Sequence, residues 1–197
     1  MAALLEDRAL KTLAAALLLL AACAADPPAE PPKPLAGQPM GPSQLRGFDI
    51  AATSVGSRVL IAGQPTPEGL ANARDAGVKV VINLRPDYEQ GYDEGTIVRG
   101  LGMAYVSMPI TEKGLTDEKV AIFIDAVNAV KQAPGGADRL LVHCQSGNRA
   151  AALWAMYEIA DAKMNPEEAV ARARKAGLTS PELVGFIGDW ARRTGAW

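Results

Sequence analysis

The chain has few cysteines and histidines, with only Cys23, Cys144 and His143 among its 197 residues. Once Cys23 carries a lipid, as its sequence context predicts, one histidine and one cysteine remain. These two cannot build the usual zinc site, so we expect no metal and no cofactor. The single histidine also argues against a Cys-His-Asn protease. His143 directly precedes Cys144 in an expected strand, where neighbouring side chains point to opposite faces.

The chain also lacks an excess of charge of either sign. Lys and Arg number 20 and Asp and Glu number 22, which gives a net charge of −2. Proteins that bind nucleic acid through its phosphates present a basic field, so we expect no nucleic-acid partner. A composition of 49% hydrophobic and 21% charged residues is that of a globular protein, and the length suits one domain with appendages.

A hydrophobic run long enough to span a bilayer is also missing. The apolar run over residues 12–22 is shorter than the roughly 20 residues that a spanning helix needs. It follows Arg8 and Lys11 and ends in Leu20-Ala-Ala-Cys23, which resembles a bacterial lipoprotein signal with its lipobox. A soluble secretory signal and an uncleaved anchor are the alternatives.

These features predict a lipoprotein signal peptide over residues 1–22, a tether over 23–43 and a folded domain over 44–197. The tether is expected to be extended, because residues 26–42 include seven prolines. The domain is expected to be exported, on the periplasmic side, and anchored to a membrane through lipid on Cys23. Acylation of Cys23 would leave Cys144 as the one thiol, so no internal disulfide is expected.

Short apolar strands alternate with helical segments in the domain. Strands are predicted over residues 58–62, 78–84, 104–108 and 140–143, and residues 48–53 could pair with the first of them. Helices are predicted to begin at Thr66, Thr116, Arg149, Asn165 and Ser180, whereas residues 88–102 are glycine-rich and only weakly helical. This order predicts an α/β three-layer sandwich with a mostly parallel central sheet and helices on both faces. Sites in such sheets lie at the carboxyl ends of strands.

Cys144 lies at such a strand end, before a polar loop and a helix. Successive backbone N–H groups and the helix dipole in this arrangement bind an anion and favour the ionised form of Cys144. Gly147 can adopt the positive φ that the turn needs, and Arg149 offers a planar fork for two oxygens of an oxyanion. We therefore predict a thiolate nucleophile whose substrate is held by the loop residues Gln145, Ser146, Gly147 and Asn148.

Three further residues are candidates near this loop. His143 could orient the cysteine by bonding nearby backbone, or it could be purely structural. Arg85 follows a predicted strand and could add a second positive charge for the substrate, or it could pair with Asp87 or Glu89 as a loop clamp. Gln64 is expected to pack in its loop, with substrate contact as the minority alternative.

Four short blocks resemble a known family. Ala62-Gly-Gln-Pro65, Val80-Val-Ile-Asn-Leu-Arg-Pro-Asp87, Met108-Pro-Ile110 and the Cys144 loop are similar to the phosphatase-like domain of the beta-lactamase hydrolase-like protein, itself similar to dual-specificity phosphatases. The resemblance covers residues 58–157. It implies a phosphatase-like catalytic domain with a cysteine-phosphatase-like fold, Cys144 as nucleophile and Arg149 as the clamp for the oxyanion.

The resemblance also implies a mechanism for a small oxyanion or a phosphorylated substrate. Cys144 would attack phosphorus and form a phosphocysteine, while a general acid protonates the leaving alkoxide. Glu112 stands where the similar phosphatases carry an aspartate, and Asp117 is the second candidate. Either could instead be a solvated acid.

The spacing in the Cys144 loop leaves the chemistry open. Four residues separate Cys144 from Arg149, whereas cysteine phosphatases have five and rhodanese sulfurtransferases have four. One residue at the start of a helix turns a side chain by about 100°. A sulfurtransferase that forms a Cys144 persulfide is therefore the alternative to a phosphatase-like hydrolase. An inactive anion-binding module is the third alternative.

Overall fold

The computed structural model describes residues 45–49, 52–55, 58–132 and 139–197. The expected signal peptide, Cys23 and the expected tether therefore lie outside the described residues. Within the part that is described, no helix is both long enough and apolar enough to cross a membrane.

A five-stranded sheet forms the centre of the domain, in the order β1-β2-β5-β3-β4. Four strands are parallel, and β1 pairs antiparallel with β2 at one edge. The strands are β1 (Thr53–Ser54), β2 (Val59–Ala62), β3 (Val78–Asn83), β4 (Ala104–Ser107) and β5 (Arg139–His143). The predicted mostly parallel sheet is thereby confirmed.

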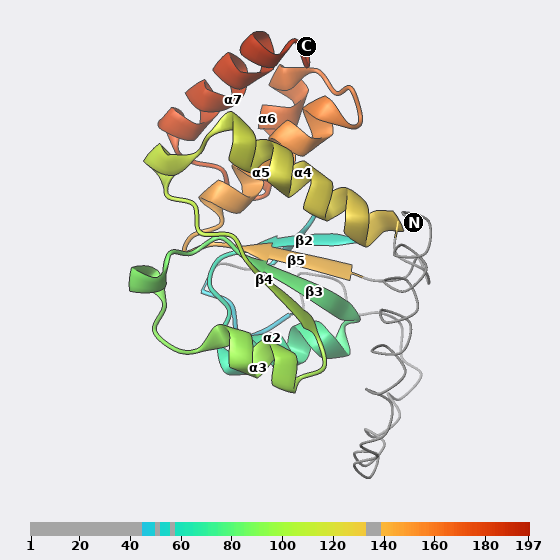
Figure 1. Cartoon of the computed structure of the whole chain (residues 1–197), viewed down its shortest axis with the longest axis vertical. Helices are drawn as coiled ribbons and strands as arrows, with labels where there is room; N and C mark the ends of the chain where they lie inside the picture. The colour runs from blue at the N-terminus through green and yellow to red at the C-terminus, as the bar shows by residue number, and fades with distance from the viewer. Residues whose placement is uncertain (1–44, 50–51, 56–57, 133–138) are drawn as a thin grey trace, which may run out of the picture. The chain divides into compact units, whose positions relative to one another are not determined.

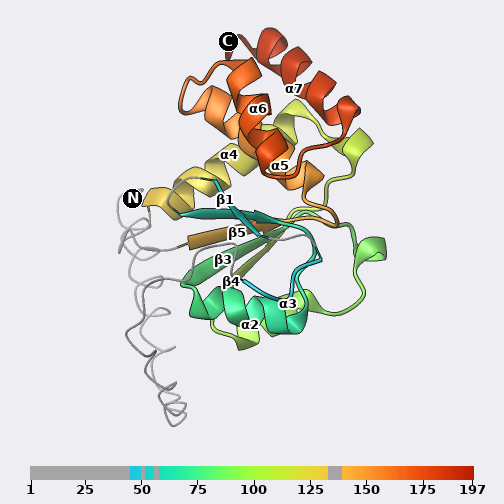
Figure 2. The same ribbon diagram turned by 180° about the vertical axis from the view of Figure 1, so that it is seen from behind.

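Helices cover both faces of the sheet (Figures 1 and 2). One face carries α2 (Pro67–Asp75) and α3 (Glu94–Gly100), and the other carries α4 (Asp117–Gln132), α5 (Asn148–Ala160), α6 (Pro166–Lys175) and α7 (Pro181–Thr194). Two 3₁₀ turns, η2 (Asp87–Glu89) and η3 (Glu112–Gly114), lie in the loops that follow β3 and β4. This confirms the predicted three-layer sandwich.

Capping residues fix where several helices begin, as their sequences predict. The Thr66 hydroxyl accepts a hydrogen bond from Gly69 N at 3.1 Å, and the Asn165 side chain accepts one from Glu167 N at 2.8 Å. The Ser180 hydroxyl accepts one from Leu183 N at 3.3 Å. A proline follows each cap, where its missing N–H costs nothing.

The prediction for residues 88–102 is corrected by the structure, because α3 is a true helix. Asp93 caps it by accepting a hydrogen bond from Thr96 N at 3.0 Å. Val98 is fully buried among the residues beneath the sheet. Tertiary packing and the cap outweigh the low helix propensity of Gly95 and Gly100 in this short segment.

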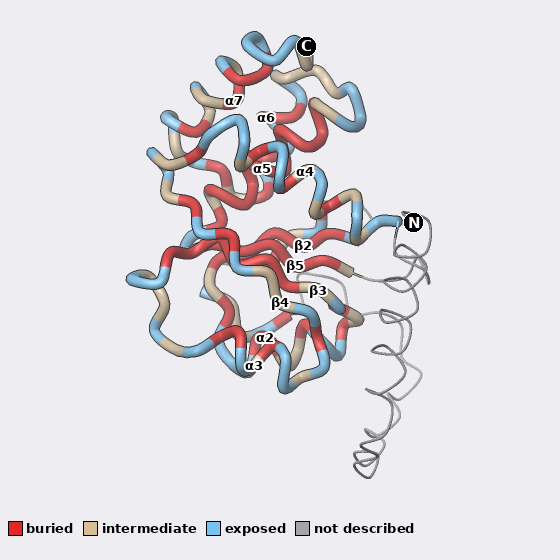
Figure 3. The backbone as a smooth tube through the Cα atoms, in the orientation of Figure 1, coloured by how far each residue is buried: buried red, intermediate tan, exposed pale blue. Residues whose placement is uncertain are grey.

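Helix α5 lies at the centre of the larger core. Every residue from Arg149 to Ile159 is buried, because α4, α6 and α7 surround the helix on the sides that the sheet leaves free. Figure 3 shows this continuous buried stretch beside the buried strands. The helix that begins at the Cys144 loop is therefore held rigidly, which fixes the position of its N-terminus.

Candidate active site

The carboxyl ends of β2, β5 and β3 meet at one edge of the sheet, and the loop over residues 144–147 connects β5 to α5 there. Gln64 N donates to Gln145 O at 3.1 Å on one side of the loop. Leu84 N donates to His143 O at 2.9 Å on the other. The loop is thus attached to both neighbouring strands, as expected for a site at the carboxyl ends of parallel strands.

The loop wraps around the sulfur of Cys144. Gly147 N donates a hydrogen bond to Cys144 Sγ at 3.1 Å, and Gly147 has a φ of +86°. A Cβ at position 147 would make only ordinary contacts at 3.7 Å, so the positive φ, rather than lack of space, calls for glycine. Cys144 is fully buried at the bottom of the loop.

Arg149 stands in the first turn of α5 and is held by two other loops. Its Nη1 donates to Glu89 Oε1 at 3.1 Å and to the Ile110 carbonyl at 2.7 Å, and its Nη2 donates to Glu89 Oε2 at 2.6 Å. Burial lowers the pKa of Arg149, but the hydrogen bonds to Glu89 and the interaction with Cys144 more than offset this and raise it. The guanidinium is therefore charged and close to the sulfur.

Glu89 and the Ile110 carbonyl use only part of the guanidinium, which also interacts with Cys144. Arg149 has five N–H donors, and Glu89 and Ile110 use three of them. The remaining donors are Nε–H and the second Nη2–H, which point the same way from the planar group. Such an edge matches two oxygens of a tetrahedral oxyanion. The arrangement can therefore bind an anion without displacing Glu89.

The other loop residues differ in their environment. Gln145 and Ser146 are exposed, while Asn148 is half-buried. The Asn148 carboxamide oxygen accepts hydrogen bonds from Thr179 N at 2.7 Å and Ser180 N at 2.8 Å, and its NH₂ group donates to Ser146 Oγ at 3.2 Å. The side chain of Asn148 thus ties the loop to the start of α7, a contact that its sequence position does not indicate.

His143 points to the other face of the sheet. It is fully buried, and its Nε2 lies 2.7 Å from Glu94 Oε1 at the start of α3. Its Nδ1 has no hydrogen-bond partner in the described part of the chain. The structure thus pairs His143 with a buried carboxylate in place of the expected backbone partner.

Arg85 does not form the clamp that was one of its two predicted roles. Glu89 binds Arg149, and Asp87 Oδ1 accepts a hydrogen bond from Gln90 at 3.3 Å. The Arg85 side chain is only 2% exposed. It lies directly after β3, beside the Cys144 loop.

The two candidate acids are both exposed but differ in their contacts. Glu112 begins η3, two residues after Ile110, whose carbonyl holds Arg149. Asp117 forms an ion pair with Arg193 of α7 at 2.7 Å. The structure therefore places the loop of Glu112 at the site and gives Asp117 a structural partner.

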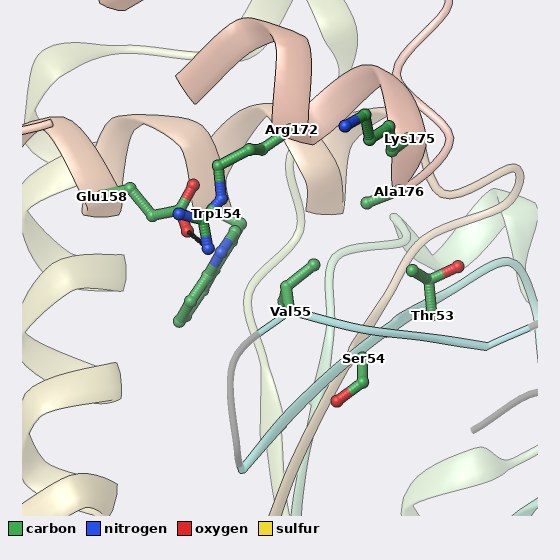
Figure 4. A pocket seen from close by; sticks show the side chains of 8 residues that line it. All are labelled: Thr53, Ser54, Val55, Trp154, Glu158, Arg172, Lys175 and Ala176. Atoms are coloured by element: carbon green, nitrogen blue, oxygen red, sulfur yellow. Dashed lines mark ion pairs between the residues drawn. The ribbon is translucent and has the colours of Figure 1, made fainter. Parts of the chain in front are cut away.

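A separate cavity of about 260 Å³ lies at the other end of α5 (Figure 4). Arg172 of α6 reaches the Glu158 carboxylate at 3.2 Å beside the Trp154 ring, and Thr53 and Ser54 of β1 line the same cavity. Glu158 follows Asn148 by ten residues of helix, or about 15 Å. This cavity is therefore not part of the Cys144 site.

Sequence reasoning missed Glu89 and Glu94, the partners of Arg149 and His143. Both contacts join residues about fifty to sixty positions apart in the chain. The sequence indicated Glu89 only as a possible ion-pair partner of Arg85. No group of three or more potential metal ligands occurs among the described residues.

Comparison with known sequences gives one family. The family described as "Beta-lactamase hydrolase-like protein, phosphatase-like domain" matches residues 52–162. The Beta-lactamase hydrolase-like protein of Xylella fastidiosa (strain Temecula1) is 32% identical over 145 residues, which cover 71% of this chain and 32% of that protein. The protein of the same name from Agrobacterium fabrum is 27% identical over 120 residues, 58% of this chain and 26% of that protein. The chain thus spans about a third of the length of the curated relatives it matches.

Comparison with solved structures gives the same fold. A DUF442 protein from Shewanella putrefaciens CN-32, provisionally named a phosphatase, is 26% identical with a TM-score of 0.62 and covers 76% of this chain and 95% of its own. A provisionally named phosphatase from Neisseria meningitidis Z2491 is 21% identical with a TM-score of 0.56, covering 68% and 94%. Tk-PTP is 18% identical with a TM-score of 0.60, covering 72% and 97%. The fold is therefore that of the cysteine phosphatases.

Proposed function

The chain belongs to the family of the phosphatase-like domain of beta-lactamase hydrolase-like proteins, and on this premise we propose that it is a cysteine-dependent phosphatase acting on a phosphate ester. The observation that carries the proposal is the pairing of Cys144 with Arg149. The sulfur receives an N–H hydrogen bond at 3.1 Å, and the guanidinium, held by Glu89 and the Ile110 carbonyl, interacts with the same cysteine.

In the proposed reaction, the Cys144 thiolate attacks phosphorus. An S–P bond forms as the ester P–O bond breaks, and the leaving alkoxide takes a proton from a general acid. Water then attacks the phosphocysteine, which releases phosphate and restores the thiolate. The amides of residues 145–148 and the guanidinium of Arg149 stabilise the three equatorial oxygens in both steps. The exposed side chains of Gln145 and Ser146 would contact the substrate at the mouth of the loop.

We assign the general acid to Glu112. Its loop is anchored to the site through the Ile110 carbonyl, and within the described part of the chain its carboxylate has no hydrogen-bond or ion-pair partner that would hold it away. Glu112→Gln is expected to lower kcat about 10²-fold for an alkyl phosphate and far less for p-nitrophenyl phosphate, whose leaving group needs little protonation. Asp117→Asn is the matched control, because Asp117 already pairs with Arg193. Equal rates for Glu112→Gln and the natural chain on both esters would exclude Glu112.

One observation favours a second function. The four residues between Cys144 and Arg149 match the loop length of rhodanese sulfurtransferases. In that reaction the thiolate attacks the sulfane sulfur of thiosulfate, an S–S bond forms and sulfite leaves. The resulting persulfide then passes its outer sulfur to cyanide, which gives thiocyanate.

A parallel assay separates these functions. The natural chain and Cys144→Ser are tested on p-nitrophenyl phosphate and on thiosulfate with cyanide. The proposal predicts phosphate release that Cys144→Ser abolishes, and no thiocyanate. Thiocyanate formation alone would establish the sulfurtransferase. Absence of both activities, with anion binding retained, would establish a silent binding module.

A further inference from the structure

Arg85 is a buried cation without a counter-ion among the described residues. The side chain is 2% exposed, the largest among the fully buried residues. Its Nε is buried without a hydrogen-bond partner, and no carboxylate in the described ranges forms an ion pair with its guanidinium. Its backbone is well anchored, since Arg85 N donates to Asn83 Oδ1 at 2.8 Å.

The carboxylates closest in sequence to Arg85 have other partners. Glu89 binds Arg149 at 2.6 Å, Glu94 binds His143 at 2.7 Å, and Asp87 accepts a hydrogen bond from Gln90. An unpaired buried charge is strongly destabilising in a folded protein. A fold that keeps such a residue gives up stability, and this pattern is typical of functional sites.

The backbone of Arg85 lies next to the start of the Cys144 loop. Asn83 pairs in register with His143, and Leu84 N donates to His143 O, so Arg85 stands beside the first loop residues. Neighbouring parallel strands are about 4.8 Å apart. Leu84 and Cys144 both face the core on the α5 side, so Arg85 faces the α3 side by alternation.

The charge of Arg85 also acts on a titratable group on the α3 side of the sheet. Burial and Glu94 raise the pKa of Tyr92 above its ordinary value, whereas Arg85 lowers it. The other charged or titratable groups around the loop come from every neighbouring element, namely His143, Arg149, Glu89, Glu94, Glu112, Tyr92 and Tyr105. None of the carboxylates among them has a hydrogen bond to Arg85.

We propose that Arg85 is a positioning residue whose unpaired charge stabilises the negative charge of the Cys144 thiolate and of the bound oxyanion from behind the loop. It acts through the charge of its guanidinium. The inference rests on the proposed function only in requiring Cys144 to react as a thiolate. The negative charge on Cys144 and on the bound oxyanion is thus the counter-ion of Arg85.

Alkylation of Cys144 by iodoacetamide, followed by peptide mass spectrometry across pH, tests this inference. The full chain, Arg85→Met and Arg85→Lys are compared, with Arg172→Met as a control for loss of a cation at the far end of α5. Arg85→Met should react about tenfold more slowly near pH 7, reach half its maximal rate at a higher pH and keep the same limiting rate. Arg85→Lys and Arg172→Met should follow the natural chain.

Thermal unfolding separates this role from a structural one. Because Arg85 carries an uncompensated buried charge, Arg85→Met should unfold at the same temperature or higher. A Met variant that is less stable or fails to fold, or that shows an unchanged alkylation profile, would overturn the proposal. Alkylation needs no turnover, so a shifted profile in a chain that hydrolyses no phosphate ester would reject the proposed function and keep the role of Arg85.

Discussion

At the scale of single residues, the contact that does most to orient Arg149 is its bidentate ion pair with Glu89. Glu89 takes one edge of the guanidinium, and the Ile110 carbonyl fixes its outer Nη1 donor. Both contacts direct the remaining edge without blocking it. Glu89 therefore orients Arg149 in the proposed reaction instead of competing with the substrate.

Glu89→Gln should lower kcat/KM for p-nitrophenyl phosphate about 10- to 10²-fold, because a neutral amide cannot hold both guanidinium nitrogens in the same way. The unfolding temperature should also fall, because Arg149 is buried and loses its charged partner. Asp87→Asn on the same 3₁₀ turn is the control, because Asp87 does not touch Arg149. Higher activity in Glu89→Gln would instead mean that Glu89 occupies the substrate's place.

The sequence suffices to predict Cys144, Gly147 and Arg149 as one constellation, because all three lie within six residues at a strand-to-helix turn. It cannot predict that Glu89 holds Arg149, since that pair depends on how two distant loops meet. The same limit applies to Arg85, for which a local clamp and a substrate contact were equally reasonable. The structure shows no such clamp: Arg85 is buried, and its Nε has no hydrogen-bond partner among the described residues.

At the scale of elements, Asn148 links the Cys144 loop to α7. Asn148→Ala removes an acceptor shared by Thr179 N, Thr179 Oγ1 and Ser180 N. The loss should be about 1–2 kcal/mol in the free energy of unfolding, measured by urea denaturation. Asn148→Asp keeps the acceptor and should recover most of it. No loss in the alanine variant would show that water replaces these contacts fully.

Helix α5 also carries a buried acid, Glu158. Burial raises the pKa of Glu158 above its ordinary value of 4.5, while Arg172 and Trp154 lower it by less. The folded state therefore binds the proton more tightly than the unfolded chain, so the stabilising contribution is complete below pH 4.5 and is lost as pH rises through the folded-state pKa.

Glu158→Gln should remove this loss of folding stability at higher pH. Urea denaturation should find it more stable than the natural chain at pH 7, with the difference shrinking toward pH 4. Glu167→Gln, at the exposed start of α6, should show no such trend. Equal stability of Glu158→Gln and the natural chain at both pH values would mean that the Arg172 ion pair offsets burial.

Periodicity and capping predict most elements of this fold, because strands β2, β3 and β5 are apolar and the helices after Thr66, Asn165 and Ser180 have N-caps and prolines. The exception is α3, whose two glycines conceal it. The Asp93 cap is local and can be recognised in the sequence, whereas the packing of Val98 against the sheet cannot.

At the scale of the whole molecule, the proposed lipid anchor concerns residues outside the described part. We propose that Cys23 is acylated after export. Cys23→Ser should then lose the lipid mass at its N-terminus and shift from the membrane to the soluble fraction of cells. Cys144→Ser should remain with the membrane. A membrane-bound Cys23→Ser chain would point to an uncleaved anchor.

The central claim is that Cys144 carries the reacting group between two half-reactions. The most direct measurement is rapid acid quenching of the natural chain during turnover of p-nitrophenyl phosphate, followed by peptide mass spectrometry. We predict a phosphoryl group on the Cys144 peptide, absent from Cys144→Ser and removed by longer incubation. An unmodified Cys144 in a chain that is releasing phosphate, or a phosphoryl group on another residue, would contradict the account.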